Sequence, residues 1–218
     1  MCFSATASFT AGALLVGIGT MTLKSVRRSR ELPFAAIPML FAIQQLSEGV
    51  IWLTFRYDAP QLNAVMTHVY SFFSHVLWPV YVPVAVLLME PSGWRRPALL
   101  PLVAVGFAVG GYLLYVMVAF PVVSRATDKH VEYLSPHFYA IATMMLYLIA
   151  IIFSLVLSSH RTVIAFGVLA LLSFAAAYFF YATWFISVWC FFAAVLSAVV
   201  YWHFVRRRVV LDSLPDAI

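Results

Sequence analysis

The sequence predicts an all-α integral membrane protein, a single bundle of seven transmembrane helices formed by residues 1–218. Composition is the first reason: 64% of the 218 residues are hydrophobic and only 10% are charged. A soluble domain of this size does not need so much apolar surface. The second reason is that apolar runs long enough to cross a bilayer as a helix, about 20 residues each, follow one another along the chain. We therefore expect a multi-pass protein of the cell membrane.

Polar clusters separate the expected spans. These spans cover residues 7–26, 33–56, 62–89, 97–121, 137–158, 161–182 and 184–204. The first four breaks carry several charged residues or prolines, in residues 24–30, 56–60, 90–96 and 125–136. The last two junctions carry only His160 with Arg161, and then Trp184, so a merger at either junction would change the helix count.

The distribution of Lys and Arg predicts the orientation, because the cytoplasmic side of a membrane protein carries their excess. With alternate loops on opposite sides, one side receives ten, at residues 24, 27, 28, 30, 95, 96, 161, 206, 207 and 208. The other side receives three, at residues 56, 125 and 129. We expect the amino terminus outside and the carboxyl terminus inside. The charges of the first run follow it, so we expect a retained span and not a cleaved signal peptide.

Glu48 is the one acidic residue inside an apolar run, whereas the other seven are expected in loops or the tail, within reach of water. An ionisable side chain near the middle of a span costs about 2.5 to 3.5 kcal/mol on insertion scales and marks a site or a pathway. Gln44 and Gln45 precede Glu48 by four and three residues, so all three share one helical face. We expect this face to line the bundle interior, with both glutamines available to bind a cofactor or ligand.

The next span holds His68 and His75, which are seven residues apart and are therefore predicted to share a face. At 1.5 Å per residue, His68 lies about 9 Å, Glu48 about 12 Å and His75 about 20 Å below the external end. If the two spans are antiparallel neighbours, Glu48 can reach either histidine. The sequence thus predicts an outward-facing polar site between these spans.

Three functions fit such a site. The favoured one is binding of a divalent transition metal (zinc, copper or iron), with hydrolytic or redox chemistry, because carboxylate and imidazole groups are common metal ligands. Its expected ligands are Glu48 and His75, which would also be the catalytic residues, with Cys2 or His68 completing the set. The second is transport of a small solute or ion, with Glu48 carrying the coupling proton. The third is structural: polar side chains that hold helices together. Whether the protein is an enzyme stays open.

The chain contains two cysteines, Cys2 and Cys190. Removal of Met1 would leave Cys2 with an amine and a thiol together, a pair that can act as a nucleophile or bind a soft metal. Cys190 lies in the last expected span, where a buried, inert thiol is the usual outcome. A disulfide between the two would require the amino terminus to dip into the bundle.

Several classes of protein are excluded by the sequence. Lys24 and Lys129, the only lysines, lie in expected loops, so no span offers a lysine for a retinal Schiff base. The chain carries no Gly-rich phosphate loop, no HExxH and no GxSxG. No basic patch interleaved with aromatic residues predicts a nucleic-acid partner, and nothing specific supports haem. The expected partners are the lipid bilayer and a small molecule or lipid; the oligomeric state stays open.

Two stretches resemble an uncharacterised family of bacterial integral membrane proteins. They are the opening Met1-Cys2-Phe3-Ser4-Ala5-Thr6-Ala7-Ser8, and Glu31-Leu32-Pro33-Phe34-Ala35-Ala36-Ile37-Pro38 with its continuation to Gln44, Gln45 and Glu48. The resemblance spans about the first quarter of the chain. It implies seven helices and a bacterial inner-membrane location, and it supplies no activity.

Overall fold

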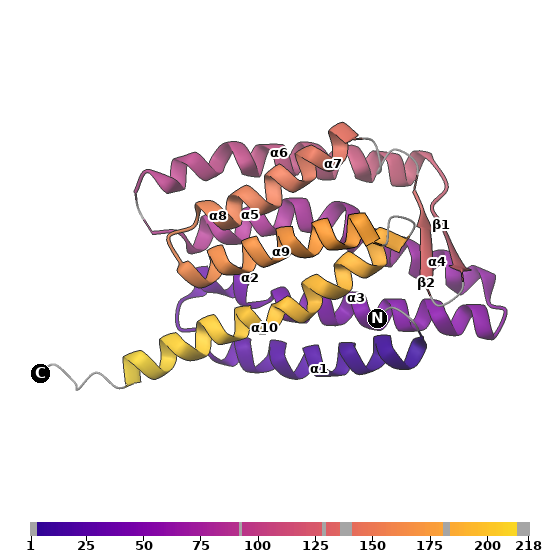
Figure 1. The fold of residues 1–218 in the computed structure, drawn as a ribbon, viewed down its shortest axis with the longest axis horizontal. Helices are drawn as coiled ribbons and strands as arrows, with labels where there is room; N and C mark the ends of the chain where they lie inside the picture. Colours follow the sequence, from indigo (N-terminus) through magenta and orange to yellow (C-terminus); the bar gives the residue numbers. More distant parts are fainter. Residues whose placement is uncertain (1–3, 92, 128–129, 136–140, 181–183, 213–218) are drawn as a thin grey trace, which may run out of the picture.

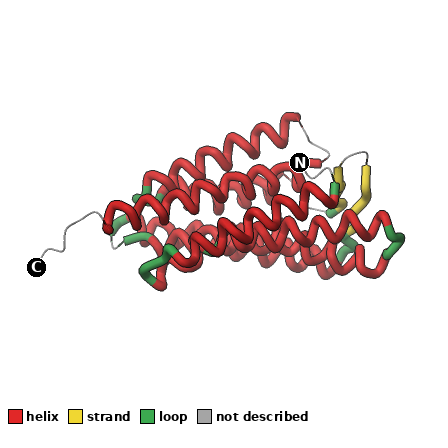
Figure 2. The backbone as a smooth tube through the Cα atoms, turned by 90° about the horizontal axis from the view of Figure 1, so that it is seen from below, coloured by secondary structure: helices red, strands yellow, loops and turns green. Residues whose placement is uncertain are grey.

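The structure is a computed structural model that describes residues 4–91, 93–127, 130–135, 141–180 and 184–212. Figure 1 shows helices that run back and forth between two ends of an elongated bundle. A two-stranded hairpin covers one end, and the last helix ends at the other; the same arrangement is seen in the perpendicular view of Figure 2. We call the first of these the hairpin end. The second is called the basic end, because Lys and Arg residues are concentrated toward it.

The first two passes pack side by side. Helix α1 (Ala5–Lys24) starts at Ser4, whose side chain accepts a hydrogen bond from the Ala7 backbone N–H at 3.2 Å, as expected of a helix cap. A 3₁₀ turn, η1 (Ser29–Glu31), and the short α2 (Leu32–Ala35) lead into α3 (Ile37–Arg56). Pro33 and Pro38 stand in the first turns of α2 and α3, where a missing backbone N–H costs little.

The next pass is a long helix with a wide turn in its middle. Helix α4 (Pro60–Ser71) continues through a π-helix, η2 (Phe72–Leu77), into α5 (Trp78–Met89). Pro79 cannot donate a backbone hydrogen bond to the preceding turn, which favours a local change of helix type there. Helix α6 (Arg95–Ala119) returns along α5, and Gly106 lies so close to the Pro79 carbonyl that no Cβ would fit.

An antiparallel hairpin follows α6 and was not predicted. Strands β1 (Val123–Thr127) and β2 (His130–Leu134) occupy most of the stretch that the sequence suggested was only a polar loop, residues 125–136. The predicted all-α class is confirmed for the bundle itself. The hairpin is its one addition among the described residues, and it packs over the ends of α4 and α10.

The remaining passes complete the bundle. Helix α7 (Ile141–Leu148), a second π-helix η3 (Ile149–Phe153) and α8 (Ser154–Leu157) form one continuous segment. Helix α9 (Arg161–Phe180) then packs against α10 (Phe185–Asp212), which also contacts α1 and α3. The last helix continues eight residues beyond the predicted end at 204, so the arginines of residues 206–208 extend α10 and do not lie in a tail.

Six helical stretches of the described chain are long and apolar enough to cross a membrane, which supports a multi-pass membrane protein in contact with lipid. The stretch Ile141–Leu157 is apolar but shorter, and it too runs from the hairpin end to the basic end (Figure 1). The predicted start of that span, at residue 137, lies outside the described residues. At the two junctions with the fewest polar residues, α8 ends at Leu157 before α9 begins at Arg161, and α9 ends at Phe180 before α10 begins at Phe185.

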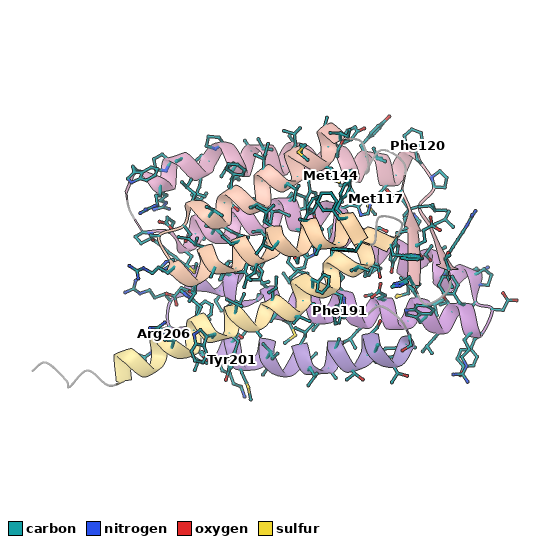
Figure 3. All side chains as sticks on the ribbon, in the orientation of Figure 1. Met117, Phe120, Met144, Phe191, Tyr201 and Arg206 are labelled. Atoms are coloured by element: carbon teal, nitrogen blue, oxygen red, sulfur yellow. The ribbon has the colours of Figure 1, made fainter. Side chains whose placement is uncertain are left out.

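The ten cationic positions assigned to one side of the membrane all lie toward the basic end. Figure 3 shows Arg206 on the far part of α10, beyond Tyr201. One expectation about the acidic residues was wrong: Glu31 and Glu90, near this end, are buried. The Glu90 carboxylate accepts hydrogen bonds from the Ser158 hydroxyl at 3.1 Å and from the Ser159 backbone N–H, which fixes the turn before α9.

Candidate functional site

Glu48 lies on α3 inside the bundle, with none of its surface exposed. Its Oε1 atom accepts a hydrogen bond from the Ser187 hydroxyl of α10 at 2.7 Å. The same atom accepts a second from the Tyr133 hydroxyl of β2 at 3.3 Å. A buried carboxyl group is therefore shared by a helix of the first half of the chain, the hairpin and the last helix. Both donors are neutral hydroxyls, which solvate a carboxylate in place of water.

Gln44 and Gln45 are fully buried on the same helix, as predicted for this face. The Gln44 carbonyl oxygen accepts a hydrogen bond from the Trp78 indole N–H at 2.8 Å, and the indole ring stacks on Phe41. The amide oxygen and nitrogen of Gln45 are buried and have no hydrogen-bond partner among the described residues. Gln44 thus links α3 to α5, whereas the Gln45 amide keeps its hydrogen-bonding capacity.

His75 is fully buried in the π-helix η2. Its Nδ1 atom lies 2.8 Å from the Ser74 hydroxyl. The Ser74 carbonyl oxygen accepts a hydrogen bond from the Tyr147 hydroxyl of α7 at 2.7 Å. Residues of two passes therefore meet around η2, and π-turns of this kind are frequent at functional sites.

His68 does not join this cluster, so the prediction that it shares a face with His75 is wrong. The His68 side chain is exposed, and its Nδ1 atom lies 2.7 Å from the carbonyl oxygen of Ala64 on its own helix. The physical reason is the π-helix, whose hydrogen bonds join residues five apart, so that it rotates less per residue than an α-helix. It turns His75 toward the bundle interior and leaves His68 at the surface.

The two cysteines have different outcomes. Cys190 is a free, buried thiol on α10, as expected, and it lies close to Gln44, Tyr70 and Glu48. Cys2 lies outside the described residues, so its role as a metal ligand or nucleophile stays a prediction. The hairpin residue Tyr133 bonds to Glu48 from the hairpin end of the bundle.

The predicted metal centre is not supported by the described part of the chain. Its four expected ligands were Cys2, Glu48, His68 and His75; of these, only Glu48 and His75 are buried in the described bundle. No group of three or more His, Cys, Asp or Glu side chains that could hold a metal ion occurs among the described residues. Two protein ligands are fewer than the three of a typical catalytic zinc site.

Several residues of the cluster were missed by sequence reasoning. Tyr133 and Ser187 hold Glu48, and Tyr70 stacks on Tyr133 with ring centroids 4.4 Å apart. Alternation in Val131–Glu132–Tyr133 was the available signal, since every second residue of a strand faces inward. Ser187 carried no comparable signal, because a serine in an apolar span is common and forms no pattern.

A chain of hydrogen bonds connects the α3–α4 turn with the hairpin. The Asn63 amide donates to the Thr54 hydroxyl at 2.8 Å and accepts from the Ser124 hydroxyl at 3.1 Å. Ser124 in turn lies 2.7 Å from the hydroxyl of Thr67, one helical turn before Tyr70. Thr54 and Asn63 also line a pocket of about 380 Å³ at the hairpin end, together with Asp58. Polar groups thus extend from this pocket toward Glu48.

A smaller cavity lies deeper in the bundle. Its volume is about 40 Å³, which exceeds the space that one water molecule needs. Trp78, Tyr147, Trp189 and Cys190 line it with several apolar residues. The cavity adjoins the Glu48 cluster through Cys190 and the Trp78–Gln44 pair, so the cluster has open space on its inner side.

Comparison with known proteins places the chain in a family without assigning an activity. No curated protein and no solved structure is similar enough to match. A family of unknown function, DUF6629, matches residues 1–214, which is nearly the whole chain. This agrees with the predicted resemblance to an uncharacterised family and extends it from the first quarter of the sequence to nearly all of it. The chain belongs to the family of unknown function DUF6629.

Proposed function

We propose that this protein is a transporter of a small solute or ion in which Glu48 binds and releases the coupling proton. The observation that carries the proposal is the position of Glu48: fully buried, and held through one oxygen by Tyr133 and Ser187. Buried acidic side chains in membrane helices mark ion and proton pathways. This carboxyl group also joins two passes of the chain and the hairpin, so its charge can influence how they pack.

Glu48 can be accommodated in both protonation states. The ionised form gains two charge-assisted hydrogen bonds from neutral hydroxyls. The neutral form avoids the cost of burying a charge in a medium of low dielectric constant. Since these effects oppose each other, a modest rearrangement of Tyr133 or Ser187 would change the proton affinity of Glu48. Coupled transport requires a group with this property.

In this proposal, the hydrogen-bonded polar side chains at the hairpin end form the route of protons toward Glu48. Protons would enter at the pocket beside Asp58 and pass along Asn63, Ser124 and Thr67 toward the Tyr70–Tyr133 pair. The excess of Lys and Arg toward the basic end favours that end in the cytoplasm. The pocket would then open to the outside. Seven crossings, with Ile141–Leu157 as the short fifth one, are part of the same proposal.

Purified protein in liposomes that contain a pH-sensitive dye tests this function. With an imposed proton gradient or membrane potential, the wild type should move protons, and Glu48→Gln should lower the rate at least about tenfold. The matched control is Glu132→Gln, which removes a carboxylate from the hairpin away from the cluster and should leave the rate unchanged. Equal rates of proton movement in the wild type and in Glu48→Gln, with both proteins folded, would contradict the proposal.

The two other functions make different predictions. Metal binding, with hydrolytic or redox chemistry, would use the described side chains of Glu48 and His75 as ligands, with Cys2 as a third. Elemental analysis of wild type beside His75→Ala tests it: stoichiometric metal lost in the variant would favour the metal site over transport. A purely structural role predicts that Glu48→Gln changes stability alone.

A further inference from the structure

One cross-strand pair supplies side-chain hydrogen bonds between the hairpin and the helices beneath it, and His130 of β2 adds a ring stacked on Trp184. Ser124 of β1 lies directly opposite Tyr133 of β2 in the antiparallel register. Both side chains are buried, whereas Val123 and Arg125, which flank Ser124 on β1, are exposed. The inward face of the hairpin therefore presents two hydroxyl groups side by side to the helices beneath it.

The two hydroxyls are held by different kinds of partner. Ser124 bonds with the neutral side chains of Asn63 and Thr67 on α4, at 3.1 and 2.7 Å. Tyr133 donates to Glu48 on α3. The first attachment has the same strength at any pH at which proteins are stable. The second depends on whether Glu48 carries a proton.

We infer that the β1–β2 hairpin is a lid over the polar cluster, closed by the Tyr133–Glu48 hydrogen bond and loosened when Glu48 binds a proton. This inference deepens the proposed function, on which it rests, by naming the device that the proton controls. An ionised carboxylate is a stronger acceptor than a neutral carboxylic acid, so protonation weakens the bond from Tyr133. Ser124 keeps the hairpin attached in both states and limits how far it moves.

Other titratable groups surround Glu48 and enter the test. They come from the elements packed around the cluster: Tyr70 of α4, His75 of η2, His130 and Tyr133 of β2, Tyr147 of α7 and Cys190 of α10. Of these, His75 and His130 are the ones whose ordinary titration range overlaps that of a buried carboxyl group. A variant of each histidine therefore separates its titration from that of Glu48.

Cysteine labelling measures how often the inward face of the hairpin becomes accessible to solvent. Val131 is fully buried on β2, and Arg125 is exposed on β1. Val131→Cys and Arg125→Cys, each in a Cys2→Ser background, report the covered and the open face of the hairpin. The ratio of their labelling rates with a water-soluble maleimide cancels most of the dependence of thiol chemistry on pH. We expect this ratio to rise about tenfold as the pH falls through the titration of Glu48.

Matched variants identify the cause. In Glu48→Gln the ratio should be high and independent of pH, because the amide stays neutral. Tyr133→Phe should also remove the pH dependence, whereas Ser124→Ala should raise the ratio at every pH and keep the dependence. His75→Asn and His130→Asn should each leave the dependence intact, and its loss in either would overturn the lid.

A ratio that does not change with pH in a folded wild type would overturn the lid, and so would a dependence that survives Glu48→Gln or disappears in His75→Asn. Proton flux in liposomes is read separately. Normal flux with an immobile hairpin contradicts only the lid, whereas a Glu48-independent flux contradicts the proposed function.

Discussion

Ser187 donates a hydrogen bond of 2.7 Å to Glu48, although 139 residues separate the two in sequence. The bond joins α10 to α3 inside the bundle, where neither side chain is exposed. Because both side chains are shielded from bulk solvent, a hydroxyl that satisfies a carboxyl oxygen contributes more than it would at a surface. The contact of the last helix with the second pass thus depends on a polar pair as well as on apolar packing.

Ser187→Ala should therefore lower stability by about 1 to 3 kcal/mol, since it removes one donor from a buried carboxyl group. Thermal unfolding of purified protein in detergent measures the loss. Ser173→Ala is the matched control, because the Ser173 hydroxyl bonds only to a carbonyl of its own helix, that of Ala170. Equal unfolding temperatures for the two variants would contradict a stabilising role of Ser187.

Trp78→Phe should cost about 1 to 3 kcal/mol, because it leaves the buried Gln44 carbonyl oxygen without the indole donor while preserving an aromatic ring on Phe41. Unfolding in a denaturing detergent, followed by circular dichroism, gives the free energy. Trp202→Phe on α10 is the control, since that indole is 59% exposed toward the surroundings of the bundle. A loss as large in the control would show that the hydrogen bond is not the cause.

Gly106→Ala should destabilise the α5–α6 contact by roughly 1 to 3 kcal/mol, because the added methyl group would overlap the Pro79 carbonyl oxygen. Gly111→Ala, five residues later on the same helix, meets nothing within 4 Å. It should be neutral or stabilising by about 0.5 to 1 kcal/mol, as helix propensity predicts. Unfolding temperatures in detergent compare the two directly, and a reversed order would contradict the close approach of these helices.

Glu90→Ala should loosen the turn between α8 and α9, because Ser158 and the Ser159 backbone N–H would lose their shared acceptor. The expected cost is about 1 to 3 kcal/mol. Hydrogen exchange of the Ser159 amide is the specific measurement and should accelerate. Unchanged exchange in the variant would mean that the turn does not need the carboxylate.

The sequence predicted the helices because apolar length and charged breaks are properties of continuous segments. It predicted the burial of Glu48 and Gln44 because a polar side chain in a long span faces its neighbours. These features depend on residues near one another in the chain. The predicted shared face of Gln44, Gln45 and Glu48 is accordingly confirmed by their complete burial.

The partners of Glu48 could not be predicted in the same way. Tyr133 reaches Glu48 from 85 positions away, through a hairpin whose alternating pattern covers only a few residues. His68 was misplaced because helical spacing assumes one helix type, and η2 changes the rotation between it and His75. The prediction was therefore right about the helix and the burial of the carboxyl group, and it missed Tyr133 and Ser187, which bond to that group.

Infrared difference spectroscopy of the purified protein tests the central claim, that Glu48 is a proton-binding group, most directly. Acidification should produce the carbonyl stretching band of a buried, protonated carboxylic acid in the wild type. The same band should be missing in Glu48→Gln and present in Glu90→Gln, whose substitution removes a different buried carboxyl group. A band that persists unchanged in Glu48→Gln, or a wild type that shows no such band at any pH at which it remains folded, would contradict the account.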